Sequence, residues 1–270
     1  MKIWHNGTFT EEAEPCLQAG DRLRLGDGVF DTLLCIDGAP AHPDLHFGRL
    51  LSHAKVLNIP VKLNEAALHK AAIDLVQQNS IKKGRHALNT FITRGPGQPG
   101  LALPAANKVQ PQIIMRLSPI TEKKDKPALN MIIAQTVRRN EGSPLSQIKS
   151  CNYGDNILAY LEAQQKGAND AIMLNNQDFV TCASSGNIFI TKKDKLFTPP
   201  LSDGVMAGIT RDLVIKRYNA QTKQLTVRDL LNADGIYITN SLRGARPVSV
   251  LEGKIMPKPP LTIDPEFHLQ

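Results

Sequence analysis

The sequence contains few cysteines, and they are far apart. The four are Cys16, Cys35, Cys151 and Cys182, and they form no Cys-x-x-Cys pair. Disulfide frameworks and structural zinc sites need more numerous or more closely spaced cysteines. The spacing therefore disfavours both, and four reduced thiols are expected.

Long apolar runs are also missing. No stretch approaches the roughly 20 apolar residues that span a bilayer. Residues 1–7 lack the charged region, apolar stretch and cleavage site of a signal peptide. With 41% hydrophobic residues the composition is that of a globular chain rather than a disordered one. We therefore expect a cytoplasmic protein that has no membrane partner.

Negative charge is in deficit, but the excess positive charge is scattered. The chain has 32 Lys and Arg against 25 Asp and Glu, a formal net charge of +7. The densest basic stretch, residues 123–126, contains Asp125 and precedes Pro127, which is typical of a solvated linker. A nucleic-acid interface needs clustered basic residues, so none is expected. A small anionic substrate needs only a few well-placed cations and fits this balance.

Apolar periodicity predicts two helices in the first half of the chain. Phe47, Leu50, Leu51 and Ala54 recur at i, i+3, i+4 and i+7, and a second stripe of this kind starts at Leu68. Strands are expected at residues 2–4, 31–36, 87–93 and 112–117.

The second half mixes strands and helices as well. A helix is expected at residues 155–166, with Gly167 as its stop signal, and another follows Gly208. Strands are expected at residues 129–137, 171–174, 188–191 and 235–239. This alternation predicts an α+β or mixed α/β protein with two domains, residues 1–118 and 128–270. Residues 119–127 would form the linker.

The start of the helix after Gly208 could bind phosphate. Free backbone N–H groups and the helix dipole attract anions there, and Thr210 could add a hydroxyl. An ordinary helix terminus with Thr210 in its first turn is the alternative.

Three polar residues lie on one stripe of the first helix. His46, Arg49 and His53 stand at i, i+3 and i+7, and Arg49 could clamp a phosphate through two hydrogen bonds. A solvated polar face is the alternative. The histidine spacing is unusual for metal ligands and no third ligand stands out, so no metal is expected.

Blocks of sequence in a fixed order resemble one enzyme family. Around Lys149 they are residues 148–153, 159–163, 167–171 and 180–189. The others are residues 26–32, His46-x-x-Arg49-Leu50, and residues 93–95, 208–211 and 239–242. Together they resemble the class IV aminotransferases, fold-type IV enzymes that use pyridoxal phosphate (PLP). The family includes branched-chain aminotransferases, D-amino acid aminotransferases and 4-amino-4-deoxychorismate lyases.

The resemblance implies a role for several residues. Lys149 matches the lysine that holds PLP as a Schiff base, and Arg49 matches the arginine that holds the cofactor phosphate. The backbone of Ile209 and Thr210 and the hydroxyls of Thr210 and Ser241 match the rest of the phosphate site. The implied protein is a homodimer of two-domain subunits, with PLP at the domain interface.

One position departs from the family pattern. Members usually read Val-Thr-Glu where this chain reads Val180-Thr181-Cys182. The glutamate keeps the pyridine nitrogen protonated, which a neutral thiol does poorly. A protonated ring is the stronger electron sink, and transamination depends on that sink more than an aromatising elimination does. A thiol that only fills space is the alternative.

Two blocks favour the lyase branch of the family. Residues 239–248 resemble the lyase pattern, and residues 94–101 resemble it except that Pro99 replaces a second arginine. No basic residue lies between Pro96 and Leu103, which argues against D-amino acids. We therefore expect a 4-amino-4-deoxychorismate lyase, with Arg94 and Asn240 meeting the substrate. A branched-chain or D-amino acid aminotransferase, or a weakly catalytic PLP-binding member, are the alternatives.

Overall fold

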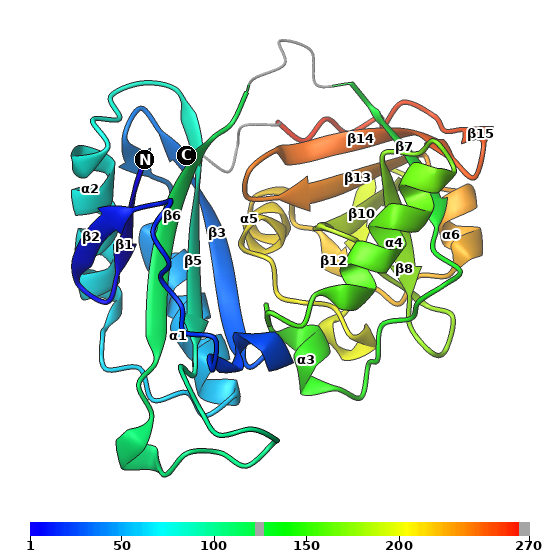
Figure 1. The fold of residues 1–270 in the computed structure, drawn as a ribbon. Helices are drawn as coiled ribbons and strands as arrows, with labels where there is room; N and C mark the ends of the chain where they lie inside the picture. The colour runs from blue at the N-terminus through cyan, green and yellow to red at the C-terminus, as the bar shows by residue number, and fades with distance from the viewer. Residues whose placement is uncertain (122–126, 265–270) are drawn as a thin grey trace. The chain divides into compact units, whose positions relative to one another are not determined.

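The computed structural model describes residues 1–121 and 127–264, which form two compact units (Figure 1). Unit 1 comprises Met1–Glu122 with Ile148–Asn152, and unit 2 comprises Lys123–Gln147 with Tyr153–Gln270. The short segment that contains Lys149 thus belongs to unit 1. Much of the expected linker, residues 122–126, lies outside the described residues. The domain boundaries expected from the sequence remain a prediction.

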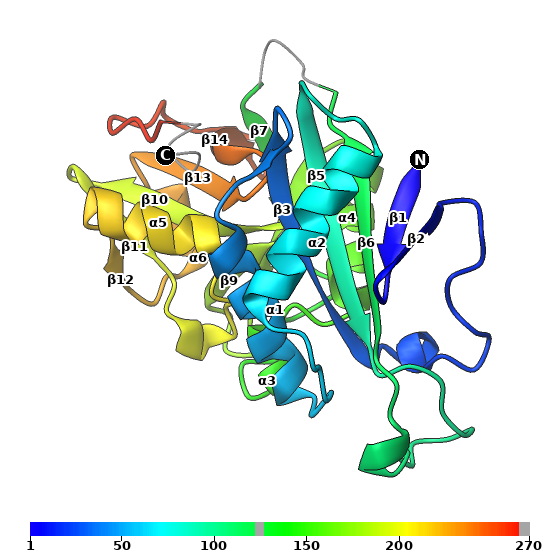
Figure 2. The same cartoon turned by 90° about the vertical axis from the view of Figure 1, so that its left-hand side faces the viewer.

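Unit 1 is a six-stranded antiparallel sheet with two helices. The strand order is β2-β1-β6-β5-β3-β4. The strands are β1 (Lys2–His5), β2 (Thr8–Glu11), β3 (Gly28–Ile36), β4 (Ala39–Pro40), β5 (Arg85–Thr93) and β6 (Gln112–Pro119). Helices α1 (Pro43–Val56) and α2 (Glu65–Gln78) cover one face of the sheet, as Figure 2 shows. Short 3-10 turns occur at Arg22–Leu25 and Ala106–Lys108.

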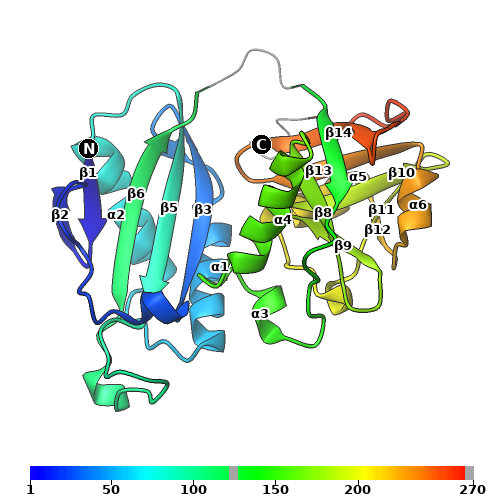
Figure 3. The ribbon, with the colours of Figure 1, turned by 45° about the vertical axis from the view of Figure 1, so that its right-hand side comes forward.

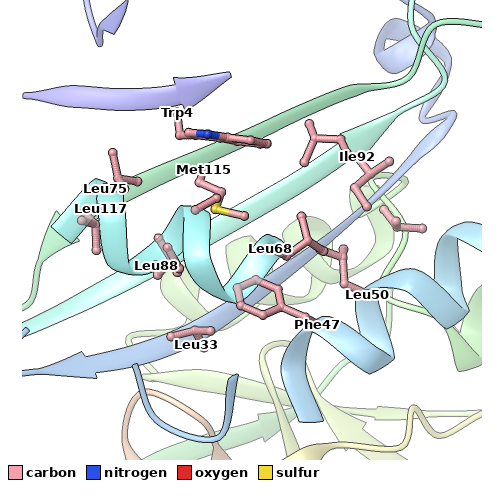
Figure 4. Packing of buried hydrophobic residues seen from close by; sticks show 14 of the residues in the cluster. Trp4, Leu33, Phe47, Leu50, Leu68, Leu75, Leu88, Ile92, Met115 and Leu117 are labelled. Carbon is pink, nitrogen blue, oxygen red and sulfur yellow. The ribbon is translucent and has the colours of Figure 1, made fainter. Parts of the chain in front are cut away.

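The core of unit 1 lies between this sheet and its helices. Phe47 and Leu50 of α1 and Leu68 of α2 are fully buried against strand residues such as Leu88 and Met115 (Figure 4). The helical periodicity read from the sequence is thereby confirmed. The N-terminus of α2 is fixed because the Asn64 side chain accepts the N–H of Ala67.

Unit 2 is built on a nine-stranded mixed sheet. The strand order is β12-β11-β10-β13-β14-β7-β8-β9, and β15 pairs with β14 outside this order. Strand β9, the last in the order, also pairs with β10. The strands are β7 (Leu129–Ile133), β8 (Asp170–Leu174), β9 (Val180–Ala183), β10 (Gly186–Lys192), β11 (Lys195–Thr198), β12 (Gln221–Thr222), β13 (Gly235–Asn240), β14 (Gly244–Leu251) and β15 (Lys254–Ile255).

Four helices belong to the described part of unit 2. They are α3 (Pro144–Gln147), α4 (Gly154–Gln165), α5 (Ile209–Tyr218) and α6 (Val227–Leu231), with a 3-10 turn at Leu201–Asp203. Helix α4 packs on β8 and α5 on β13 (Figure 3). Helix α4 ends at Gln165 with Lys166 as its C-cap, and Gly167 follows with a φ of +70° that suits glycine, as the sequence predicts.

The expected strand at residues 129–137 is too long. Strand β7 ends at Ile133. Beyond it, the carboxylate of Glu162 on α4 accepts the backbone N–H groups of Gln135 and Thr136, which takes them away from a strand ladder. Within residues 1–121 and 127–264 no helix is long and apolar enough to cross a membrane. The same residues contain no cluster of three or more His, Cys, Asp or Glu that could hold a metal ion.

Candidate active site

Lys149 is held by its backbone along strand β3. Its carbonyl accepts the N–H of Phe30 at 2.9 Å, and two residues later Cys151 donates to the carbonyl of Gly28 at 2.8 Å. Gly28 has to be glycine here, because a Cβ would lie 2.8 Å from the carbonyl of Ile92. The segment therefore extends the pairing of unit 1 and fixes where the lysine side chain begins.

The amino group of Lys149 is buried beside an aromatic ring. Its Nζ lies 4.1 Å from the centroid of the Phe30 ring. Burial lowers the pKa of Lys149 to about 8, with Asp31 opposing the shift and Arg49 adding to it. A lysine in this state has a substantial neutral fraction near pH 8, as a nucleophilic amine requires.

Asp31 ties two residues of helix α1 to strand β3. Its carboxylate is 3% exposed and accepts from Arg49 Nε at 2.8 Å and Arg49 Nη2 at 2.9 Å. His46 Nδ1 lies 2.7 Å from the same carboxylate. Burial alone would raise the pKa of Asp31, but Arg49 and His46 hold it well below its usual range.

The polar stripe on α1 is therefore not a solvated face. His46 and His53 are buried, and Arg49 is nearly so. His53 turns towards the lysine segment, where its Nδ1 accepts the N–H of Lys149 at 3.1 Å. A role for Asp31 was not predicted, although it is the only charged residue of the apolar strand expected at residues 31–36.

Arg94 is a structural residue of unit 1. It is 4% exposed, and its guanidinium donates to both carboxylate oxygens of Asp27 and to the carbonyls of Leu57 and Asn58. Four contacts of this kind hold the side chain against the protein itself. The substrate role expected of Arg94 remains a prediction.

In unit 2 the start of helix α5 lies close to strand β10. Gly208 caps the helix, and a Cβ on it would come 2.0 Å from Oδ1 of Asn187, so any larger residue would force the Asn187 side chain to move. Asn187 also donates to the carbonyl of Met206 at 3.0 Å. Ile209 and Thr210, which begin the helix, are both buried. Their position in the first turn of α5 is compatible with the phosphate role expected of them.

Cys182 lies on β9, paired in register with Asn187 of β10. It is 8% exposed and belongs to an apolar cluster that includes Ala134, Ala163 and Met173. Its sulfur is 3.5 Å from the Thr181 hydroxyl. The side chain at the family's glutamate position is thus a buried thiol with apolar neighbours.

Asn240 and Ser241 lie where β13 turns into β14. The Asn240 side chain donates to the carbonyl of Ser185 at 3.2 Å and accepts the N–H groups of Leu242 and Arg243. These bonds shape the turn, so Asn240 acts first as a structural residue and its substrate role remains a prediction. Ser241 is half-buried in the same turn.

Each unit thus brings together part of the expected set. Lys149 and Arg49 share unit 1, and both approach Asp31. Unit 2 contains the remaining expected cofactor ligands, Cys182, Ile209, Thr210 and Ser241. A buried amine of lowered pKa and a helix start capped by glycine fit an aldehyde cofactor with a phosphate group.

Comparisons with known proteins agree with this chemistry. The model of the family "Amino-transferase class IV" matches residues 28–251. The D-alanine aminotransferase of Bacillus licheniformis is 29% identical over 94% of this chain and 89% of its own. The aminodeoxychorismate lyase of Bacillus subtilis is 26% identical over 93% of this chain and 86% of its own.

A solved structure has the same fold. The branched-chain aminotransferase of Thermoproteus uzoniensis, crystallised with norvaline, superposes with a TM-score of 0.89 at 25% identity. The superposition covers 96% of this chain and 90% of that one. The expected fold and cofactor are both confirmed: the chain belongs to the class IV aminotransferase family of fold-type IV, PLP-dependent enzymes.

Proposed function

We propose that this chain is a PLP-dependent lyase that converts 4-amino-4-deoxychorismate to 4-aminobenzoate and pyruvate. The observation that carries the proposal is Cys182, a buried thiol at the position of the family's glutamate. Bound PLP supplies an electron sink for the carbon next to the substrate nitrogen. A thiol supports that sink less well than a carboxylate does, and an elimination that creates an aromatic ring depends on it less.

Lys149 would act both as the carrier of the cofactor and as a base. Its amine is buried and has a pKa of about 8, so it can bond to an aldehyde when neutral. With the substrate bound, the same amino group would be the base that takes the proton from the substrate carbon. One residue would thus serve two steps.

Arg49, the start of α5 and Ser241 would hold the cofactor phosphate. Asp31 accepts N–H donors from Nε and Nη2 of Arg49, and the guanidinium would bring its positive charge to the phosphate. Ile209 and Thr210 would add first-turn N–H groups of α5. The Asp31 pair also holds the guanidinium plane in place, which pre-organises the arginine.

A class IV aminotransferase is the second candidate. It is favoured by the similarity to the D-alanine aminotransferase of Bacillus licheniformis and to the branched-chain aminotransferase of Thermoproteus uzoniensis. One experiment separates the two. Purified protein with PLP is given 4-amino-4-deoxychorismate, and separately D-alanine or a branched-chain amino acid with 2-oxoglutarate. The lyase proposal requires pyruvate and 4-aminobenzoate in equal amounts and slower formation of glutamate.

The exposed face of helix α4 supports a homodimer. Ile157 and Leu158 are 54% and 51% exposed, and Tyr160 and Leu161 are exposed beside them. A group of large apolar side chains at helical spacing is typical of a protein interface. Light scattering should give twice the chain mass for the wild type and a smaller mass for Leu158→Glu. A monomeric wild type would refute the dimer.

A further inference from the structure

The two buried histidines of helix α1 face different partners. His46 Nδ1 lies 2.7 Å from the Asp31 carboxylate. Because this carboxylate is ionised and can only accept, the His46 ring must carry a proton on Nδ1. The position of that proton is thus fixed by the partner.

The geometry around His53 requires the opposite tautomer. Its Nδ1 lies 3.1 Å from the backbone nitrogen of Lys149, a group that donates and does not accept. Nδ1 must therefore carry a lone pair, and the ring proton lies on Nε2. A doubly protonated ring could not make this bond.

The groups around His53 keep its ring neutral. Arg49 on α1 and Lys149 on the 148–152 segment bring positive charge, and Asp31 on β3 brings negative charge. Burial, with Arg49 and Lys149, lowers the pKa of His53 to about 4, against a smaller opposing effect of Asp31. The acceptor is therefore available over the whole physiological pH range.

With His53 in place, the backbone of Lys149 is held on both sides. Phe30 donates to its carbonyl at 2.9 Å, and His53 accepts its N–H at 3.1 Å. The side chain of Lys149 therefore starts from a fixed point. A nucleophile needs such placement, because small displacements from the reactive geometry are costly in rate.

We propose that His53 is a positioning residue for Lys149 and acts through its unprotonated Nδ1, which accepts the Lys149 N–H. The inference rests on the proposed function in one respect, that Lys149 is the lysine to which PLP bonds. It assigns a purpose to a histidine that neither the phosphate site nor the lysine chemistry uses directly.

Two substitutions separate the acceptor from mere packing. Asparagine at 53 places an oxygen near the position of Nδ1, whereas leucine fills similar space without an acceptor. His69→Leu, a half-buried histidine on α2, is the matched control. In His53→Leu we expect amide hydrogen exchange of Lys149 to be roughly tenfold faster, the scale of one lost hydrogen bond. His53→Asn and His69→Leu should exchange like the wild type.

A second measurement follows PLP capture. Added PLP is reduced with borohydride at set times, and the adduct on Lys149 is quantified by mass spectrometry. Capture should be slower in His53→Leu and restored in His53→Asn. If the wild-type adduct forms on another lysine, the proposed function fails, while the exchange data still test the His53 bond by itself.

The wild type alone can also overturn the proposal. Nitrogen-15 NMR of histidine-labelled protein should show the Nε2-protonated tautomer for His53, neutral down to about pH 5, and a proton on Nδ1 of His46. A cationic His53 at pH 7, or a proton on its Nδ1, would contradict the inference. Equal loss in the asparagine and leucine variants would also contradict it, because packing would then be the cause.

Discussion

The surroundings of Lys149 and of Cys182 differ sharply in charge. Within unit 1, Lys149 lies near Asp31, Arg49 and His53, all partly or fully buried and joined by hydrogen bonds. Within unit 2, Cys182 lies in a cluster of alanines and other apolar residues. Burying the charged groups around Lys149 costs desolvation free energy, which their mutual pairing has to offset. Burying the apolar groups around Cys182 carries no such cost.

This contrast bears on two protonation states, that of the Lys149 amine and that of the cofactor ring. The charged region lowers the pKa of Lys149, the amine that would carry the cofactor in the proposed function. In that proposal the apolar region around Cys182 would do little to stabilise a protonated ring. Each substitution that follows alters one region, and the other serves as the reference.

Lys149→Ala should have the largest effect. Turnover should fall by several orders of magnitude, because carrier and base are lost together. In the wild type, the visible absorbance shows that PLP is bound. Borohydride reduction followed by mass spectrometry identifies Lys149 as its site. An adduct at a different lysine would contradict the assignment of Lys149 as the lysine that binds PLP.

Asp31→Ala should destabilise the charged region strongly. It leaves Arg49 and His46 buried without their carboxylate, which costs about 3–5 kcal/mol. Chemical denaturation gives the free energy of unfolding, and Asp74→Ala, which breaks an exposed pair with Lys70, should cost less than about 1 kcal/mol. Equal effects of the two substitutions would show that the Asp31 network is unimportant.

The pH dependence of this contribution has a definite sign. The folded-state pKa of Asp31 lies below its ordinary value, so the stabilisation is present above about pH 4. It is lost as the pH falls further. The gap in stability between wild type and Asp31→Ala should therefore close in acid.

Arg49→Ala should weaken PLP binding by about 1.5–3 kcal/mol, the scale of a charge-assisted hydrogen bond. Ser241→Ala should cost about 0.5–1.5 kcal/mol, because its hydrogen bond is neutral on the serine side. Titration of the apo-protein with PLP measures both. Unchanged affinity in Arg49→Ala would return that residue to a purely structural role beside Asp31.

Capture of PLP by the apo-protein should follow the ionisation of Lys149. Because its pKa is lowered to about 8, the rate should rise about tenfold per pH unit below pH 8 and level off above it. Stopped-flow absorbance measures the rate. A rise that continues to pH 10 would mean that the amine titrates like an exposed lysine.

Cys182→Glu should have the smallest effect and changes the apolar region. A carboxylate should raise transamination about tenfold, the equivalent of one pKa unit of preference for the protonated ring, and change elimination less. Parallel assays of both reactions measure the ratio. If neither rate changes, the thiol is only a packing residue.

Much of the site could be predicted from sequence, since its residues fall in short blocks. Lys149, Arg49 and the Gly208 turn lie within local motifs, and the α1 stripe follows from periodicity. Asp31 and His53 could not be assigned, because their partners are 18 and 96 residues away and depend on how β3, α1 and residues 148–152 pair. The contacts of Arg94 with Asp27 and backbone carbonyls could not be predicted either, because a motif does not show the partners of a guanidinium.

In the fold too, features set by local sequence were predictable and features set by long-range contacts were not. Helix limits were predictable from apolar spacing and glycine stops. The strand order of the unit 2 sheet was not, because pairing between strands that are distant in the sequence, such as β14 with β7, leaves little local trace. Strand β7 was predicted too long because Glu162, which binds the next N–H groups, is more than 20 residues away.

Nitrogen-15 NMR of PLP labelled at the ring nitrogen tests the central contrast most directly. With the buried thiol of Cys182 at the family's glutamate position, the bound cofactor should show an unprotonated pyridine nitrogen at pH 7, and Cys182→Glu should shift it towards the protonated form. A fully protonated ring in the wild type would contradict the account, because the region around Cys182 would then supply the charge that we infer it lacks.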